Sequence, residues 1–100
     1  MKDIVDTAII AEIWAVIEER AKNPLQESYT SNLLGDAKGI DKVLEKVGEE
    51  STEFIIAAKN GVDVRTIQEA SDLIFHLLVA LRAADIDLSD VMQELKNRRK

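Results

Sequence analysis

Apolar residues recur at helical spacing along most of the chain, and the polar stretches between these runs hold three of its four glycines and its one proline. The runs predict helices at residues 4–22, 40–59, 64–84 and from 88 onward, with a short helical turn near Leu33 and Leu34. So few glycines and prolines favour long helices over a turn-rich β fold. We therefore expect one all-α domain over residues 1–100, a bundle of about four helices.

The expected helix ends carry residues typical of helix boundaries. The first helix should stop by Asn23, because the residue before Pro24 is pushed out of the α region. The dipeptide Asn60-Gly61 is a common C-terminal stop for the 40–59 helix. N-cap residues are expected at Thr30 or Ser31 for the short turn, at Asp63 and at Asp87.

The 40–59 helix separates an apolar face from an acidic one. At 100° per residue the apolar side chains fall within about 120° of one another, and we expect this face to be buried. Its members are Ile40, Val43, Leu44, Val47, Phe54, Ile55 and Ala58. Glu49, Glu50 and Glu53 occupy the adjoining sector, with Lys42 and Lys46 on the same stripe, so the acids border the core.

The 64–84 helix is apolar on nearly every side, which predicts burial on several sides. Glu69, Asp72 and His76 nevertheless share one narrow stripe of it. Carboxylates on a buried helix need a cation or hydrogen-bonding partners, since uncompensated burial costs several kcal/mol. A helix this apolar is also buried more easily when a second subunit contributes to the bundle. We therefore expect a homodimer, or a larger oligomer built from dimers.

Composition narrows the class of protein. The formal net charge of −6 argues against non-specific nucleic-acid binding, which needs a positive surface. With no cysteine, disulfides, zinc–thiolate sites and thiol nucleophiles are excluded. The N-terminus lacks a secretory apolar run, and the longest apolar stretch, 73–81, is far short of the ~20 residues that span a bilayer. We expect a cytoplasmic protein without a membrane partner.

Two acid pairs spaced three residues apart carry the candidate chemistry: Glu50 with Glu53, and Glu69 with Asp72. Carboxylates converging from two helices suit Mg²⁺, with Mn²⁺ as a possible substitute, and such ions commonly act on phosphates. The competing interpretation is a solvated helix face, with Lys46 pairing to Glu50 across one turn. His76 is interpreted as a core-edge histidine bonded to Asp72 or to substrate rather than as a metal ligand.

Several blocks also match a known family. They are Ser-Tyr-Thr at 28–30, Lys-Val-Gly-Glu-Glu-Ser-Thr-Glu at 46–53, Ala-Ala-Lys at 57–59, Glu-Ala-Ser-Asp-Leu-Ile-Phe-His-Leu-Leu-Val at 69–79 and Leu-Ser-Asp-Val at 88–91. Together they resemble the phosphoribosyl-ATP pyrophosphatases, MazG-like all-α enzymes of the second step of histidine biosynthesis. Ser51-Thr52, Ser71 and Phe75 stand where that family usually has small residues and a tyrosine.

The resemblance implies hydrolysis of phosphoribosyl-ATP to phosphoribosyl-AMP and pyrophosphate. It implies one or two Mg²⁺ ions on Glu50, Glu53, Glu69 and Asp72. Glu49 is expected as a further ligand or as the base that orients a water molecule, and Lys46 as the group that stabilises phosphate charge. The expected substrate-binding residues are Lys42, Ser28, Tyr29, Thr30 and His76.

Two alternative functions stay open from the sequence. A housekeeping MazG-like pyrophosphatase acting on NTPs or dNTPs would share the four acids. A non-enzymatic helical interaction module would carry the same acids as a solvated surface.

Overall fold

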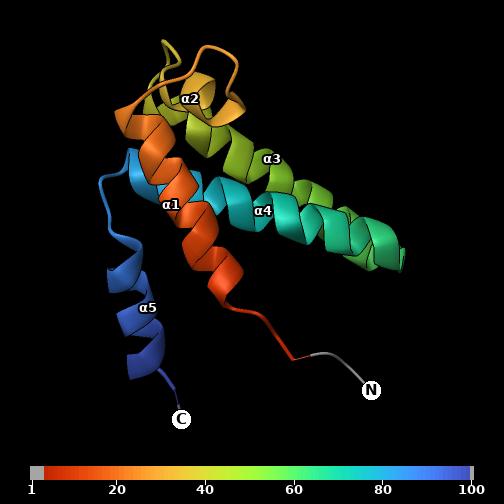
Figure 1. The fold of residues 1–100 in the computed structure, drawn as a ribbon. Coiled ribbons are helices and arrows are strands. Elements are labelled where there is room, and N and C mark those ends of the chain that lie inside the picture. The colour runs from red at the N-terminus through yellow and green to blue at the C-terminus, as the bar shows by residue number, and fades with distance from the viewer. Residues whose placement is uncertain (1–3, 100) are drawn as a thin grey trace.

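The computed structural model describes residues 4–99, and within them the chain forms five helices and no strand (Figure 1). The helices are α1 (Ala8–Lys22), α2 (Tyr29–Leu34), α3 (Ile40–Lys59), α4 (Asp63–Ala83) and α5 (Leu88–Asn97). The all-α prediction is confirmed, and the short turn expected near Leu33 is α2. The bounds of α3 are those predicted, α4 is displaced by one residue, and α1 begins four residues later than expected.

The two long helices form the frame of the molecule. In Figure 1, α3 and α4 run side by side in opposite directions, and α1 lies across α4. The short α2 sits beside the start of α3, and α5 leads away from the end of α4. The far end of the α3–α4 hairpin extends beyond the other helices in this view.

The core lies around α4, which α1, α2 and α3 all contact, and each of the five helices of residues 4–99 contributes to it. Its buried members are Ile17, Leu33, Val43, Leu78, Val79, Ala80 and Leu88. Ile17, Val43 and Val79 are fully enclosed, and the partly buried Trp14 and Phe75 pack against the cluster. Burial of these side chains is the main source of stability that holds α1 against the hairpin.

The connection between α3 and α4 is a compact C-terminal cap. Gly61 has φ +69°, and its N–H donates to the carbonyl of Ala58 at 3.2 Å. The N–H of Val62 donates to the carbonyl of Ala57 at 3.4 Å, which completes a Schellman motif. The left-handed conformation favours glycine here, so this turn confirms the predicted stop and directs α4 back along α3.

Two predicted N-caps are wrong and one is confirmed. Ser28 caps α2 by accepting the Ser31 N–H at 3.1 Å, which places Thr30 and Ser31 inside the helix. Asp63 is the first residue of α4, which begins one residue earlier than predicted. Asp87 caps α5 as expected and accepts from the Ser89 N–H at 2.8 Å.

The predicted apolar faces of the two long helices are only partly covered. On α3, Val43 is buried and Val47 and Phe54 are half-buried, but four residues predicted to be in the core are exposed: Ile40, Leu44, Ile55 and Ala58. On α4, Leu78 is buried, whereas Ile67, Ile74 and Leu77 are exposed. The reason is geometric, because α3 and α4 pack chiefly on each other and each offers one face to that contact.

Within residues 4–99, no helix has both the length and the apolar character needed to cross a bilayer.

Candidate active site

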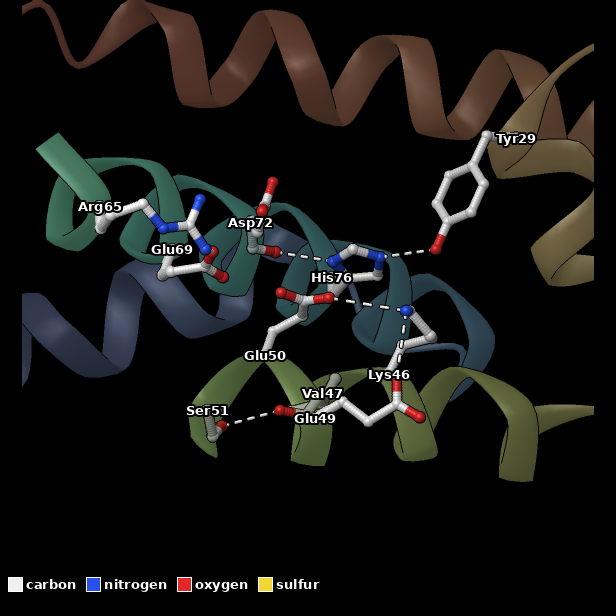
Figure 2. A network of polar contacts seen from close by, with 10 residues as sticks. All are labelled: Tyr29, Lys46, Val47, Glu49, Glu50, Ser51, Arg65, Glu69, Asp72 and His76. Carbon is white, nitrogen blue, oxygen red and sulfur yellow. Dashed lines mark hydrogen bonds and ion pairs between the residues drawn. The ribbon is translucent and has the colours of Figure 1, made fainter. Parts of the chain in front are cut away.

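Three carboxylates from the two long helices meet at one place. Glu50 lies in the middle of α3, and Glu69 and Asp72 lie three residues apart on α4 (Figure 2). One carboxylate oxygen from each of the three lies within 4.8 Å of the others. The antiparallel hairpin produces this meeting, since it brings the second half of α3 beside the first half of α4.

Two of the three carboxylates are buried, which makes their negative charges costly in free energy unless they are compensated. Glu50 is 7% exposed and Glu69 is 3% exposed, whereas Asp72 is open to solvent. The Oε2 atoms of Glu50 and Glu69 are buried and have no hydrogen-bond partner among residues 4–99. Buried carboxylate oxygens without partners are costly, and a hard cation with oxygen ligands is the group that would satisfy them. The donor set therefore fits Mg²⁺ or Mn²⁺.

The other two candidate acids of α3 lie outside this trio. Glu53, one turn after Glu50, is exposed and lines a shallow hollow together with Arg65. Glu49 is also exposed and accepts a hydrogen bond from Lys46 Nζ at 3.1 Å. Of the five acids singled out from sequence, the structure thus brings three together and leaves two at the rim.

Lys46 supplies positive charge beside the cluster. Its Nζ lies 3.1 Å from Glu49 Oε2 and 3.6 Å from Glu50 Oε1. The hydrogen bond to Glu49 raises the pKa of Lys46 above its ordinary value, and the same bond lowers the pKa of Glu49. Both groups are therefore charged at neutral pH. Lys42, one turn earlier, lines a hollow between α2 and α3 with Lys46 and Tyr29.

His76 connects the cluster to α2. Its Nδ1 lies 2.7 Å from the main-chain carbonyl oxygen of Asp72, which can only accept, so Nδ1 carries the proton. In the neutral ring Nε2 is then the acceptor, and the Tyr29 hydroxyl donates to it at 2.8 Å. Both ring nitrogens are engaged, and His76 is not a member of the carboxylate trio.

Tyr29 remains a hydrogen-bond donor over the physiological pH range. Loss of solvent around the hydroxyl raises the pKa of Tyr29, while the nearby Lys46 charge lowers it to a smaller extent. Its ring also lies edge-on to His76, with 5.7 Å between ring centroids. The Tyr29 hydroxyl is thus fixed by two successive hydrogen bonds, which connect α2 through His76 to the main chain of Asp72.

The remaining residues of the Ser-Tyr-Thr segment shape α2. Ser28 caps the helix, and Thr30 is buried. Ser31, which the sequence indicated only as a possible cap, is buried and donates from Oγ to the Arg20 carbonyl at 3.0 Å. That bond ties α2 to the end of α1. The segment therefore positions Tyr29 rather than presenting all of its hydroxyls.

One residue of the site was missed from sequence. The guanidinium of Arg65 forms an ion pair with Glu69 Oε1 from one turn earlier on α4. The Arg-x-x-x-Glu spacing, which places both side chains on the same side of a helix, was the available clue.

The sequence is similar to those of known proteins over most of its length. Residues 10–99 match the family model described as phosphoribosyl-ATP pyrophosphohydrolase. The chain is 68% identical to a phosphoribosyl-ATP pyrophosphatase of Methanoregula boonei, over 99% of this chain and 95% of that protein. It is 60% identical to one of Methanosphaerula palustris, over 95% and 96%, and 49% identical to one of Bacillus mycoides, over 90% and 82%. The chain belongs to the phosphoribosyl-ATP pyrophosphohydrolase family.

Proposed function

We propose that this protein hydrolyses phosphoribosyl-ATP to phosphoribosyl-AMP and pyrophosphate, the second step of histidine biosynthesis, with a divalent cation held by Glu50, Glu69 and Asp72. The relatives that align with nearly the whole chain are named after that activity. The observation that carries the metal assignment is the pair of buried Oε2 atoms on Glu50 and Glu69, which have no hydrogen-bond partner in the part of the chain that the structure describes. A phosphorylated nucleotide substrate also favours a cytoplasmic location.

A Mg²⁺ ion at this site would supply charge neutralisation for phosphate oxygens and lower the pKa of a water molecule. Lys46, whose ammonium stays protonated, would stabilise the charge that builds on the leaving pyrophosphate as the phosphoanhydride breaks. Glu49 stays ionised beside Lys46, and its carboxylate can accept a hydrogen bond from the attacking water and orient it.

Glu53 would act as a metal ligand at the outer side of the carboxylate cluster. It lies one turn after Glu50 on the same helix and is exposed, so its side chain is free to reorient. Glu53 would supply a carboxylate oxygen to a second cation bound together with the substrate phosphates.

The substrate would lie beside the hollow between α2 and α3. Tyr29, Lys42 and Lys46 line it next to the carboxylates, and two ammonium groups there suit a chain of phosphates. His76 holds the Tyr29 hydroxyl in place, and Ser28 caps the helical turn that carries it, in which Thr30 is buried.

We further propose that two copies of the chain form a homodimer through the apolar faces that α3 and α4 leave uncovered. Large side chains on these faces are exposed in the single chain: Ile40, Leu44, Ile55, Ile56, Val64, Ile67, Ile74 and Leu77. Monomeric soluble proteins rarely leave so many apolar side chains exposed on adjacent helices. The hairpin that carries the site would then lie at the centre of the assembly.

A substrate panel tests the activity. With Mg²⁺ present, pyrophosphate release should be far faster from phosphoribosyl-ATP than from ATP, dUTP or dCTP at the same concentration. Comparable turnover of the ordinary nucleotides would favour a housekeeping pyrophosphatase. No turnover of any substrate, together with no saturable Mg²⁺ binding in calorimetry, would favour a non-enzymatic interaction module.

A further inference from the structure

Two cations flank the carboxylate cluster in matching positions, one on each long helix. Lys46 lies one turn before Glu50 on α3, and Arg65 lies one turn before Glu69 on α4 (Figure 2). Each cation contacts the Oε1 atom of its glutamate. In both glutamates the Oε2 atom is left buried and without a partner among residues 4–99.

Arg65 reaches this buried position from the surface. Its side chain is 56% exposed, whereas that of Glu69 is 4% exposed. The guanidinium makes a fork: one nitrogen contacts Glu69, and Nη1 donates to Gln68 Oε1 at 2.8 Å. The planar group is thereby held at two points, and its charge lies beside Oε1 of Glu69.

We infer that Arg65 is the internal counter-ion of Glu69, and that it competes with the divalent cation for this carboxylate and so weakens metal binding. The inference rests on the proposed metal site. Three carboxylates within 4.8 Å repel one another, and the Arg65 guanidinium in contact with Glu69 Oε1 offsets part of that repulsion in the metal-free protein. The same fixed positive charge repels an incoming divalent ion.

The direction of the effect follows from charge. A unit charge and a divalent ion several ångströms apart repel measurably even in a water-like dielectric. Replacing Arg65 by a neutral residue should therefore tighten Mg²⁺ binding about three- to tenfold at low ionic strength. It should also destabilise the metal-free protein, because the carboxylates then lose one of their two cations.

The test compares variants of the full-length protein by calorimetric titration with Mg²⁺ alone and by thermal unfolding without metal. Arg65→Gln should lower the Kd for Mg²⁺ by about three- to tenfold and lower the metal-free Tm. Arg65→Met, which keeps the apolar stem, should give the same result. Arg65→Lys keeps the charge but not the planar fork, so its Kd for Mg²⁺ should lie closer to wild type than those of the two neutral variants. Arg98→Gln removes an arginine from an exposed pair with Glu94 on α5 and should leave Mg²⁺ affinity unchanged.

The outcomes separate this inference from the proposed function. If wild-type protein binds Mg²⁺ saturably and both neutral variants, shown native by circular dichroism, bind it with unchanged or weaker affinity, the inference is wrong and the metal site stands. An equal tightening in Arg98→Gln would also overturn it, because the effect would then be one of net charge. If the wild-type protein shows no saturable Mg²⁺ binding, both the inference and the metal site are wrong.

Discussion

The Tyr29 hydroxyl donates a 2.8 Å hydrogen bond to Nε2 of His76 and so joins α2 to α4 across 47 residues of sequence. His76 in turn donates from Nδ1 to the carbonyl of Asp72. Tyr29, which is proposed to contact substrate, is thereby connected to the helical turn that carries one acid of the candidate metal site. The connection is tertiary, since neither helix could form it alone.

Tyr29→Phe should break this connection with little change in shape. The buried Nε2 of His76 would lose its partner, so the free energy of unfolding should fall by about 1 kcal/mol. Because Tyr29 is also proposed to contact substrate, KM should rise more than kcat falls. Urea unfolding and steady-state kinetics measure the two effects. Unchanged stability would show that solvent replaces the hydroxyl at no cost.

Glu50→Gln and Glu69→Gln should each abolish metal-dependent pyrophosphate release. Each change removes a buried carboxylate of the cluster but keeps its size, so activity should fall by at least about a hundredfold. The helical fold should remain, and metal-free stability should be kept or increased because like charges within 4.8 Å are reduced. Activity assays, Mg²⁺ calorimetry and circular dichroism are the measurements. Full activity of both variants in Mg²⁺ would rule out the assignment.

Ile67→Glu should disrupt self-association. Ile67 is 66% exposed in the single chain and lies on α4 seven residues before Ile74, on the same face. A charge placed there would be buried against the partner, so sedimentation equilibrium should change from dimer to monomer. Leu25→Glu, at an apolar residue that is 49% exposed and lies outside α3 and α4, is the control and should stay dimeric. A dimeric Ile67→Glu would place the interface elsewhere.

Asp85→Gly should stabilise the protein. Asp85 has φ +60° at the end of α4, where the Ile86 N–H donates to the Leu81 carbonyl at 2.9 Å, as in the turn around Gly61. Glycine removes the left-handed strain, and the net gain should be about 0.5–1 kcal/mol in urea unfolding.

The matched change at the other turn, Gly61→Ala, should destabilise by about 1–2 kcal/mol. A Cβ at position 61 would meet no non-neighbouring atom of residues 4–99 within 4 Å, so the cost is that of the backbone conformation alone. The free energy of unfolding should thus rise in Asp85→Gly and fall in Gly61→Ala. Changes in the same direction would contradict the assignment of backbone strain to these two positions.

Protonation of Asp87 should contribute to the loss of stability of the folded protein at low pH. Hydrogen bonds from the Ser89 hydroxyl and N–H lower the pKa of Asp87 below its ordinary 3.8. A carboxylate with a depressed folded pKa stabilises the protein above its unfolded pKa, and this contribution is lost as pH falls through the folded pKa. Asp87→Asn keeps a capping side chain that does not titrate. The difference in Tm between the wild-type protein and this variant should therefore shift against the wild type as the pH is lowered from about 5 to about 2. A Tm difference that stays constant over this range would contradict the expectation.

Local patterns determined much of this protein. The bounds of α3, the Asn60-Gly61 stop and the Asp87 cap follow from residues within a turn or two of one another, because helical hydrogen bonds join neighbours in sequence. The E-x-x-E and E-x-x-D spacings indicated paired carboxylates suited to a metal ion, because residues three apart are neighbours on one helix. The Arg65–Glu69 pair was predictable in principle from its spacing of four residues.

Only the tertiary structure decided which of these side chains meet. Glu50 reaches Glu69 and Asp72, whereas Glu53 from the same motif stays at the rim, because the antiparallel contact of α3 with α4 selects one turn. The same contact leaves Ile55 and Ile67 exposed, although both belong to apolar helix faces. Sequence periodicity describes one helix at a time, and the choice of partner for each face depends on packing between segments far apart in the chain.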